Sequence, residues 1–373
     1  MRNGYAINEV QGRAYMMETI IAKTGEEHID RVIISEAGAI IKKGGLVAFP
    51  TETVYGLGGD ALQKASARKI YAAKGRPSDN PLIVHICQWD AIRKITKNLP
   101  HAAKLLAEAF WPGPLTMILE KADVVPEETT GGLSTVAVRM PDHKIALALI
   151  EAAGGYVAAP SANVSGRPSP TLAEHVWEDM NGRIEMLLDG GAACIGLEST
   201  IVDLTADRPA VLRPGYITKE MLEDVMGVPV EAAGAVMEES AQGPKAPGMK
   251  YRHYAPAGEM TVVRGKEEAV VAAIRRLTRE KRQMGEKVGI ICAKETWGCY
   301  EADYVEAVGS KGDELAAAQH LYAVLRSFDS RHVTCIYSEA FTGQGIGQAV
   351  MNRLLKAAGY HILEAEKTGG KEL

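Results

Sequence analysis

Hydrophobic residues follow two alternating spacings along most of the chain. Over 29–43 they recur every three or four positions, as on the buried face of a helix, and the next apolar run, 46–50, has the length of a buried strand. The same patterns continue to residue 227 and return from residue 260. They predict a glycine-rich loop over 51–61, and helices over 64–74, 143–154, 171–180, 218–227, 313–328 and 348–359, with a further helix that ends at WPGP (111–114) and a charged helix between 264 and 287. They predict strands over 81–86, 115–120, 135–140, 156–160, 184–189, 199–204, 260–264, 287–293 and 332–337.

Strands that alternate with helices are typical of an α/β domain. Some predicted strands follow one another directly, which predicts a twisted sheet of mixed rather than purely parallel strands. A segment rich in Ala, Gly and Pro, without either periodicity, interrupts the pattern. We therefore predict an N-terminal extension over 1–28, a twisted mixed-sheet α/β domain over 29–227, a long linker over 228–258 and a smaller, Rossmann-like α/β domain over 259–373.

The composition is that of a globular protein, with 46% hydrophobic and 24% charged residues among 373. No apolar run approaches the roughly 18 residues needed to cross a bilayer, and the first residues are mostly polar, so we expect neither a membrane span nor a secretion signal. Five cysteines without a C-x-x-C pair argue against disulfides and zinc and favour the cytoplasm. The formal charge of −5 indicates no general attraction to nucleic acid.

Two cations stand close together at the end of the helix predicted over 64–74. Pro77 disfavours the helical conformation for Arg76, so we expect an extended segment with Lys74 and Arg76 on one side. Two converging cations suit an anion with several oxygens, such as a phosphate chain or a carboxylate. The alternative is that both only complement the dipole at the end of the helix.

A second pair with the same spacing, Ser161 and Asn163, lies in a loop after the strand predicted over 156–160. In an extended loop both would face the same way, beyond the carboxyl end of a strand, where α/β sheets bind ligands. The alternative is a turn without a ligand, which Ser, Asn, Gly and Pro also favour. The chain has no G-x-x-x-x-G-K-[ST] loop, so ATP would have to be held in another way.

An arginine lies in the strand predicted over 135–140. Alternation puts Thr135 and Arg139 on one face of that strand. A buried arginine requires a partner, which could be a protein carboxylate or a bound carboxylate. His85 lies in the strand predicted over 81–86. Considered by itself, it is most simply explained as a hydrogen-bonded histidine of the core. Further hydroxyls and cations occur in two loops, at Ser199 and Arg213.

Seven longer blocks occur in a fixed order along the first predicted domain. They are FPTETVYGLGGDA, KGRPSDNPLIVHI, FWPGPLT, TVAVRMPDH, APSANVSGRPSPT, GLESTIVDLT and VLRPGYIT. Together they resemble the signature blocks of the YrdC-like family of threonylcarbamoyl-AMP synthases, over 29–227. The segment PGMKYRHYAP and the smaller domain resemble the longer, two-domain branch of that family.

The resemblance implies a YrdC-like fold and a nucleotidyltransferase. Such an enzyme joins ATP, L-threonine and bicarbonate or CO2 into threonylcarbamoyl-AMP and releases diphosphate. A partner transferase then moves the threonylcarbamoyl group to the adenosine beside the anticodon of tRNAs. We expect no strong direct tRNA binding by this acidic chain. Mg2+ is expected to enter with ATP, because the motif blocks offer no cage of carboxylates.

The resemblance also implies roles for individual residues. Lys74 and Arg76 match the family's K-x-R pair, and we assign the catalytic role to them. The residues that match nucleotide-binding positions are Arg76, Asn80, Thr135, Ser161, Asn163, Ser169, Arg213 and Tyr251. Those that match threonine-binding positions are Thr53, His85, Arg139 and Ser199.

The linker is expected to have a role at the site, and two other functions are considered for the chain. We hypothesise that the linker folds over the site as a lid, through Tyr251 and its neighbours Lys250 and His253. The main rival is a non-enzymatic RNA-binding module, which the acidic charge and the lack of an aromatic array disfavour. The other is carbamoyl transfer of the hydrogenase-maturation type, which the lack of C-x-x-C motifs disfavours.

Overall fold

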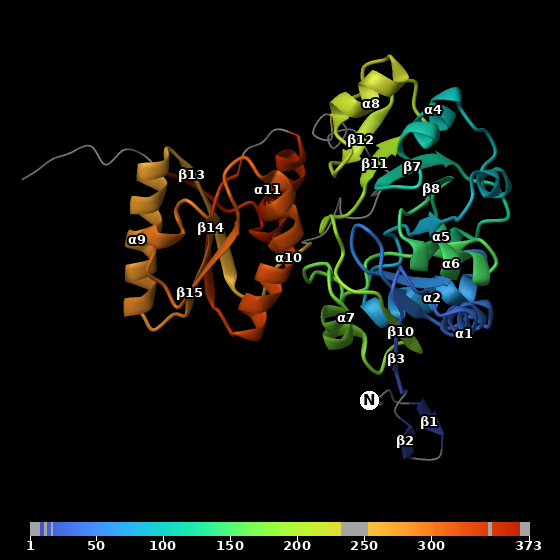
Figure 1. Ribbon diagram of the computed structural model, residues 1–373, viewed down its shortest axis with the longest axis horizontal. Coiled ribbons are helices and arrows are strands. Elements are labelled where there is room, and N and C mark those ends of the chain that lie inside the picture. The colour runs from blue at the N-terminus through green and yellow to red at the C-terminus, as the bar shows by residue number, and fades with distance from the viewer. Residues whose placement is uncertain (1–7, 11–12, 16–17, 233–252, 342–344, 366–373) are drawn as a thin grey trace, which may run out of the picture. The chain divides into compact units, whose positions relative to one another are not determined.

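The computed structural model describes residues 8–10, 13–15, 18–232, 253–341 and 345–365 (Figure 1). The chain forms two compact units. The first comprises Met1–Ser165 and Ser169–Tyr251, and the second comprises Gly166–Pro168 and Arg252–Leu373. Near the N-terminus, β1 (Asn8–Val10) and β2 (Arg13–Tyr15) form an antiparallel pair.

A ten-stranded sheet forms the centre of the first unit. Its strands in spatial order are β12 (Ala210–Arg213), β11 (Thr200–Asp203), β7 (Leu115–Glu120), β8 (Thr135–Arg139), β6 (Ile83–His85), β9 (Val157–Ala158), β5 (Gly56–Asp60), β4 (Val47–Phe49), β10 (Met186–Asp189) and β3 (Ile20–Lys23). β6 pairs with β8 and β7 with β11 in parallel, whereas β7 pairs with β8 and β6 with β9 in antiparallel orientation. The sheet is mixed, as predicted.

Three strands of this sheet lie where the sequence predicts none. β3 lies in the predicted N-terminal extension, and β12 lies in what was expected to be a loop around Arg213. β5 lies in the predicted glycine-rich loop, where a Cβ on Gly58 would be 2.9 Å from Phe49 Cε1 and from Val157 Cγ1. Glycine therefore lets this strand pass between side chains that leave no room for another one.

Helices and core follow the predicted patterns more closely. The main hydrophobic cluster contains Val136 and Val138, whereas Ala137 belongs to a separate small cluster with Ile83 and Ile118. The alternation predicted for β8 is therefore confirmed. The helices of the first unit are α1 (Arg31–Lys42), α2 (Lys64–Lys74), η1 (Trp89–Ala91), α3 (Ile92–Ile95), α4 (His101–Phe110), α5 (Glu127–Thr130), α6 (Lys144–Ala152), α7 (Ala173–Met180) and α8 (Lys219–Met226).

The second unit contains a wholly parallel five-stranded sheet. Its strands in spatial order are β15 (Tyr304–Gly309), β14 (Val288–Ala293), β16 (Cys335–Glu339), β13 (Glu259–Gly265) and β17 (Ile362–Ala365), of which the sequence does not predict β15 and β17. Its helices are α9 (Glu267–Gln283), η2 (Trp297–Cys299), α10 (Glu314–Ser330) and α11 (Ile346–Ala357). In the part of the chain that the structure describes, none of the helices could span a bilayer.

The start of α1 provides a test of the local structure. Asp30 is the N-cap, and its Oδ1 accepts hydrogen bonds from the amides of Val32 (2.9 Å) and Ile33 (3.3 Å). We expect Asp30→Ala to lower the free energy of unfolding by about 1 kcal/mol, because two amide groups at the helix end lose their acceptor. Urea unfolding measures this change. Asp224→Ala, an exposed position inside α8, is the matched control, and an equal loss in both variants would contradict the assignment.

Candidate active site

The buried ammonium group of Lys74 holds the loop that follows β9. Lys74 is the last residue of α2 and is 1% exposed. Its Nζ donates to the carbonyl oxygens of Ser161 (2.5 Å) and Asn163 (2.6 Å). Ser161 Oγ donates to Asn163 Oδ1 (2.5 Å), and the Ser165 amide donates back to the Lys74 carbonyl (2.8 Å). A buried ammonium group is costly unless acceptor oxygens form hydrogen bonds with it. Lys74 therefore fixes the conformation of this loop.

Arg76 binds a different segment from Lys74. Gly75 adopts a left-handed conformation (φ 61°) at the end of α2, so the extended conformation predicted for this stretch is wrong. Arg76 Nε donates to the carbonyl oxygen of Asn80 (3.2 Å), and Nη2 donates to that of Pro81 (3.0 Å). The K-x-R pair thus anchors two segments, one after β9 and one before β6.

Asn80 is almost fully enclosed, at 1% exposure. Its Oδ1 is buried and accepts no hydrogen bond from the part of the chain that the structure describes. A buried carbonyl oxygen without a donor is costly. Asn80 therefore has one acceptor available for a ligand.

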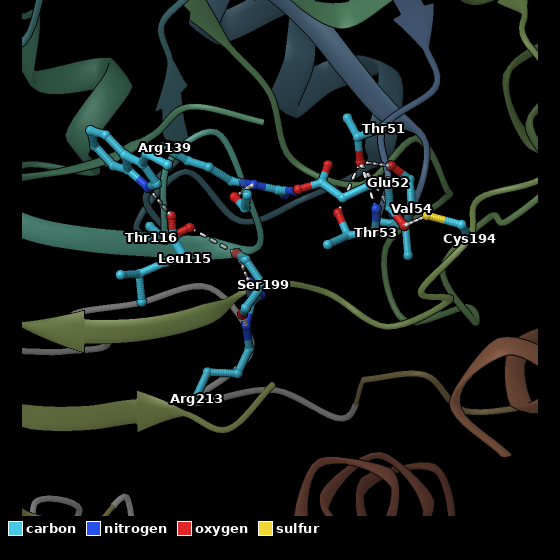
Figure 2. A network of polar contacts seen from close by, with 12 residues as sticks. Thr51, Glu52, Thr53, Val54, Leu115, Thr116, Arg139, Cys194, Ser199 and Arg213 are labelled. Atoms are coloured by element: carbon cyan, nitrogen blue, oxygen red, sulfur yellow. Dashed lines mark hydrogen bonds and ion pairs between the residues drawn. The ribbon is translucent and has the colours of Figure 1, made fainter. Parts of the chain in front are cut away.

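Arg139, the last residue of β8, forms a buried ion pair with Glu52. Arg139 Nη2 lies 2.7 Å from Glu52 Oε1, and the two side chains are 5% and 6% exposed. Arg139 Nε also donates to the carbonyl oxygen of Gly113 (3.3 Å). Figure 2 shows the two side chains extending toward each other. The sequence left open whether a protein or a bound carboxylate faces Arg139, and Glu52 occupies that position here.

A second polar chain runs beside Arg139 across the sheet. Arg139 is in register with Thr116 of β7. Thr116 Oγ1 lies 2.7 Å from Ser199 Oγ, which also accepts a hydrogen bond from Arg213 Nη2 (3.1 Å) (Figure 2). Arg213 Nε donates to the Ser199 carbonyl oxygen (3.0 Å). Two arginines and two hydroxyls therefore meet where β8 ends and β7 and β11 begin.

His85 lies next to this group and is uncharged. It is in register with Arg139 and is 3% exposed. Burial, together with the positive charge of Arg139, lowers the pKa of His85 to about 3. Its Nδ1 lies 3.1 Å from the Ile83 carbonyl oxygen, which can only accept, so Nδ1 carries the proton and Nε2 is an acceptor.

The segment 51–55 connects the loop held by Lys74 with the group around Arg139. The Ala162 amide donates to the carbonyl oxygen of Tyr55 (2.8 Å), and the Gly196 amide donates to that of Thr53 (3.1 Å). Thr53 is fully buried. These backbone bonds fix the segment that carries Glu52 and Thr53 against the loops on both sides.

Three further predicted site residues, Ser169, Thr135 and Tyr251, lie apart from one another in the chain's structure or outside its described part. Ser169 Oγ donates a hydrogen bond to Oε1 of Glu198 (2.5 Å), the residue that precedes Ser199 in the chain. Thr135 begins β8, at the end opposite Arg139. Tyr251 and Lys250, on which the lid hypothesis depends, lie outside the described residues. Among the residues that are described, no three His, Cys, Asp or Glu side chains gather as a metal site.

Family profiles cover most of the chain. A profile described as "Telomere recombination" (Sua5, YciO, YrdC) matches residues 39–215, and one described as "Threonylcarbamoyl-AMP synthase, C-terminal domain" matches residues 217–359. The threonylcarbamoyl-AMP synthase of Pyrococcus abyssi is 48% identical over 338 residues, which are 91% of this chain and 97% of that protein. The chain belongs to the threonylcarbamoyl-AMP synthase family.

Other members of the threonylcarbamoyl-AMP synthase family support this placement. The Bacillus subtilis protein of that name is 47% identical over 88% of this chain and 94% of its own length. The crystal structure of P. abyssi Sua5 complexed with L-threonine has a TM-score of 0.88 at 47% identity, and the match covers 93% of this chain and 100% of that one. A shorter synthase from Halorhodospira halophila, 35% identical, matches only 49% of this chain but 90% of its own length. The family therefore contains members that match nearly the whole of this chain and shorter members that match about half of it.

Three residues of the site escaped prediction: Glu52, Thr116 and Glu198. Glu52 and Glu198 stand inside the motif blocks TETVYG and GLEST, but no local pattern says that a carboxylate there is buried. The signal that could have found Glu52 is the requirement of the buried Arg139 for a counter-charge. Several carboxylates could have met that requirement, so the sequence did not select one.

The neutral state of His85 predicts a pH dependence. The pKa of this side chain is about 3 in the folded chain and close to 6.5 when unfolded, so below pH 6.5 the unfolded state binds a proton that the folded state does not. The neutral His85 therefore leaves the free energy of unfolding unaffected above pH 6.5. As the pH falls from 6.5 toward 3, protonation of the unfolded state lowers that free energy by up to roughly 1.4 kcal/mol per pH unit. We therefore expect His85→Gln to lose less stability than the parent chain between pH 6.5 and 4 in urea unfolding.

The exposed His28→Gln variant is the matched control for this measurement. It keeps the buried imidazole, so its stability should follow that of the parent chain across the same pH range. A parallel pH dependence in the His85→Gln variant and the parent chain would contradict the assignment of the buried neutral imidazole.

Proposed function

We propose that this protein is a nucleotidyltransferase that makes threonylcarbamoyl-AMP from ATP, L-threonine and bicarbonate or CO2 and releases diphosphate. The observation that carries the proposal is the bond between the family's two paired motifs in this chain. Lys74 of K-x-R holds the S-x-N loop through the carbonyl oxygens of Ser161 and Asn163, so the two motifs are joined through this lysine. Family membership supplies the reaction to which this arrangement is suited.

The reaction brings two anions together. A carbamate oxygen on the threonine nitrogen must bond to the α-phosphorus of ATP while the bond to diphosphate breaks. The protein has little covalent work to do, so positioning and fixed positive charge provide most of the acceleration. Lys74 and Arg76 are buried, and their protein contacts pre-position them, so they need little rearrangement during the reaction. Lys74 also keeps Ser161 and Asn163 in place for the nucleotide.

The nucleotide lies along the segments that these cations hold. Asn80 offers a buried acceptor that nothing in the described chain satisfies, and it suits an N–H donor of the nucleotide. Mg2+ would enter with ATP, because the motif blocks offer no dedicated cage of carboxylates. The residues proposed to contact the nucleotide are Arg76, Asn80, Thr135, Ser161, Asn163, Ser169, Arg213 and Tyr251.

Threonine lies on the group around Arg139. The Arg139 guanidinium binds its carboxylate in the bidentate manner that planar guanidinium groups favour. Thr53 and Ser199 offer hydroxyl groups, and His85 offers an acceptor at Nε2 for the threonine hydroxyl. Arg213 contacts Ser199, so a nucleotide-binding residue and a threonine-binding residue touch, as a reaction between the two substrates requires.

The product places the protein before a second enzyme. A mixed anhydride of this kind is hydrolysed by water, so a tRNA threonylcarbamoyl transferase in the same compartment, the cytoplasm, must consume it. This chain itself does not bind tRNA strongly.

The direct test is incubation of the purified protein with ATP, threonine and bicarbonate, followed by mass spectrometry for threonylcarbamoyl-AMP. We expect the mixed anhydride and threonine-dependent release of diphosphate. Threonine-independent release, or none, would exclude the synthase. RNA binding without either product would instead support the non-enzymatic alternative.

A substitution at Arg76 tests its role within that reaction. We expect Arg76→Lys to reduce diphosphate release about ten-fold or more, because lysine keeps the charge but lacks the planar fork that bonds two groups at once. Arg93→Lys, an exposed position whose side chain is 68% accessible, is the matched control and should keep full activity. Equal activity in the Arg76→Lys variant and the parent chain would remove Arg76 from the reaction.

A further inference from the structure

Glu52 is a buried carboxylate to which the proposed reaction gives no role. The residue is 5% exposed, and its Oε1 lies 2.7 Å from Arg139 Nη2. Both carboxylate oxygens are buried, yet neither accepts a hydrogen bond from any residue that the structure describes. In Figure 2 the carboxylate points at the guanidinium, away from the cluster of Thr51 and Thr53.

The rest of the segment around Glu52 is fully engaged. The Glu52 carbonyl oxygen accepts from the Ile195 amide (2.8 Å), and Thr51 Oγ1 donates to the Val54 carbonyl (2.6 Å). Thr53 Oγ1 lies 2.8 Å from Thr51 Oγ1. The backbone is thus held in place, while the carboxylate, which can accept about four hydrogen bonds, has only its ion pair with Arg139 among the residues that the structure describes.

A buried ion pair with unsatisfied oxygens is an unfavourable arrangement for stability alone. Taking both charges out of water is repaid only when further hydrogen bonds satisfy the remaining lone pairs. The Glu52–Arg139 pair lacks those bonds in the described chain. A ligand that brings N–H donors next to Glu52 would supply them.

We propose that Glu52 binds the α-ammonium group of the substrate amino acid and, with Arg139, forms a clasp for the zwitterion. The proposal rests on the function above, in which Arg139 binds the carboxylate of threonine. In any α-amino acid the ammonium nitrogen and the carboxylate carbon are about 2.5 Å apart, because both are bonded to Cα. Arg139 Nη2 and Glu52 Oε1 are in direct contact, at 2.7 Å, so a group as small as a zwitterion can reach both side chains, with its carboxylate on Arg139 and its ammonium on Glu52.

The clasp explains how the site selects an amino acid. Its own charges sum to zero, and so do those of a zwitterion, so docking leaves no uncompensated buried charge. A carboxylic acid without the amino group would bring one negative charge next to Glu52 and be repelled. Glu52 is therefore a specificity-determining residue as well as a binding residue.

A purely structural role for Glu52 makes a different prediction. If Glu52 only held Arg139 in place, its removal would weaken every ligand of Arg139 alike. If Glu52 binds the ammonium, its removal weakens threonine alone, and the analogue without the amino group binds as well as before or better. The two roles therefore differ in the sign of one measurable effect.

The experiment compares two ligands on the full-length chain by calorimetry. The ligands are L-threonine and (R)-3-hydroxybutanoate, which lacks only the amino group. We expect the parent chain to prefer threonine about ten-fold or more, and Glu52→Gln to raise the Kd of threonine about ten-fold or more without raising that of the analogue. Glu52→Asp should recover part of the threonine affinity.

Controls separate this proposal from the function on which it rests. Glu339→Gln removes another buried carboxylate, in the second unit, and should change neither affinity. Arg139→Gln should weaken both ligands, and unchanged threonine binding in that variant would contradict the threonine site itself. An equal loss for both ligands in the Glu52→Gln variant would overturn the ammonium role. So would equal affinity of the parent chain for the two ligands, a measurement that needs no variant to fold.

Discussion

A single buried ammonium group determines much of the arrangement of this site. Lys74 is the last residue of α2, and its ammonium group is buried. This group donates hydrogen bonds to carbonyl oxygens of the loop after β9. Because an unpaired charge at this depth costs several kcal/mol, neither the helix end nor the loop can move without the other. Ser161 and Asn163 thus owe their positions to a residue almost ninety positions earlier in the chain.

The buried cations of the site are held by groups of the protein itself. Arg76 is bound by backbone carbonyl groups, Arg213 by Ser199, and Arg139 by the Glu52 carboxylate and the Gly113 carbonyl oxygen. Among the site residues that the structure describes, the buried side-chain atoms without a hydrogen bond lie on Asn80 and on the Glu52–Arg139 pair. Such a division is typical of binding sites: the groups that hold the architecture are satisfied internally, and the groups that meet the ligand are left to it.

The sequence predicted the architecture better than the geometry of the site. Alternation along 135–139 correctly placed Arg139 and Ala137 on the face opposite Val136 and Val138, because period two is a property of the strand itself. The extended conformation expected after Lys74 was wrong, because Gly75 turns the chain left-handed. The partner of Arg139 could not be chosen, because β8 meets the segment before β5 only through tertiary folding. The order of the motifs identified the family. No motif, however, indicates which hydrogen-bond donors of the site are already engaged by other groups in the folded chain.

The glycine strand β5 has a consequence for how sequence change reaches the site. At Gly56, Gly58 and Gly59 a methyl group would already lie within about 3 Å of neighbouring side chains. Every missense change at a glycine codon adds at least a Cβ, so a change at Gly58 must displace its neighbours, and one at Gly56 or Gly59 must push them by a few tenths of an ångström. The segment that carries Glu52 and Thr53 runs directly into it. A population of natural variants should therefore show inactive proteins whose altered residue touches neither substrate, because the displaced backbone moves Glu52 and Thr53 instead.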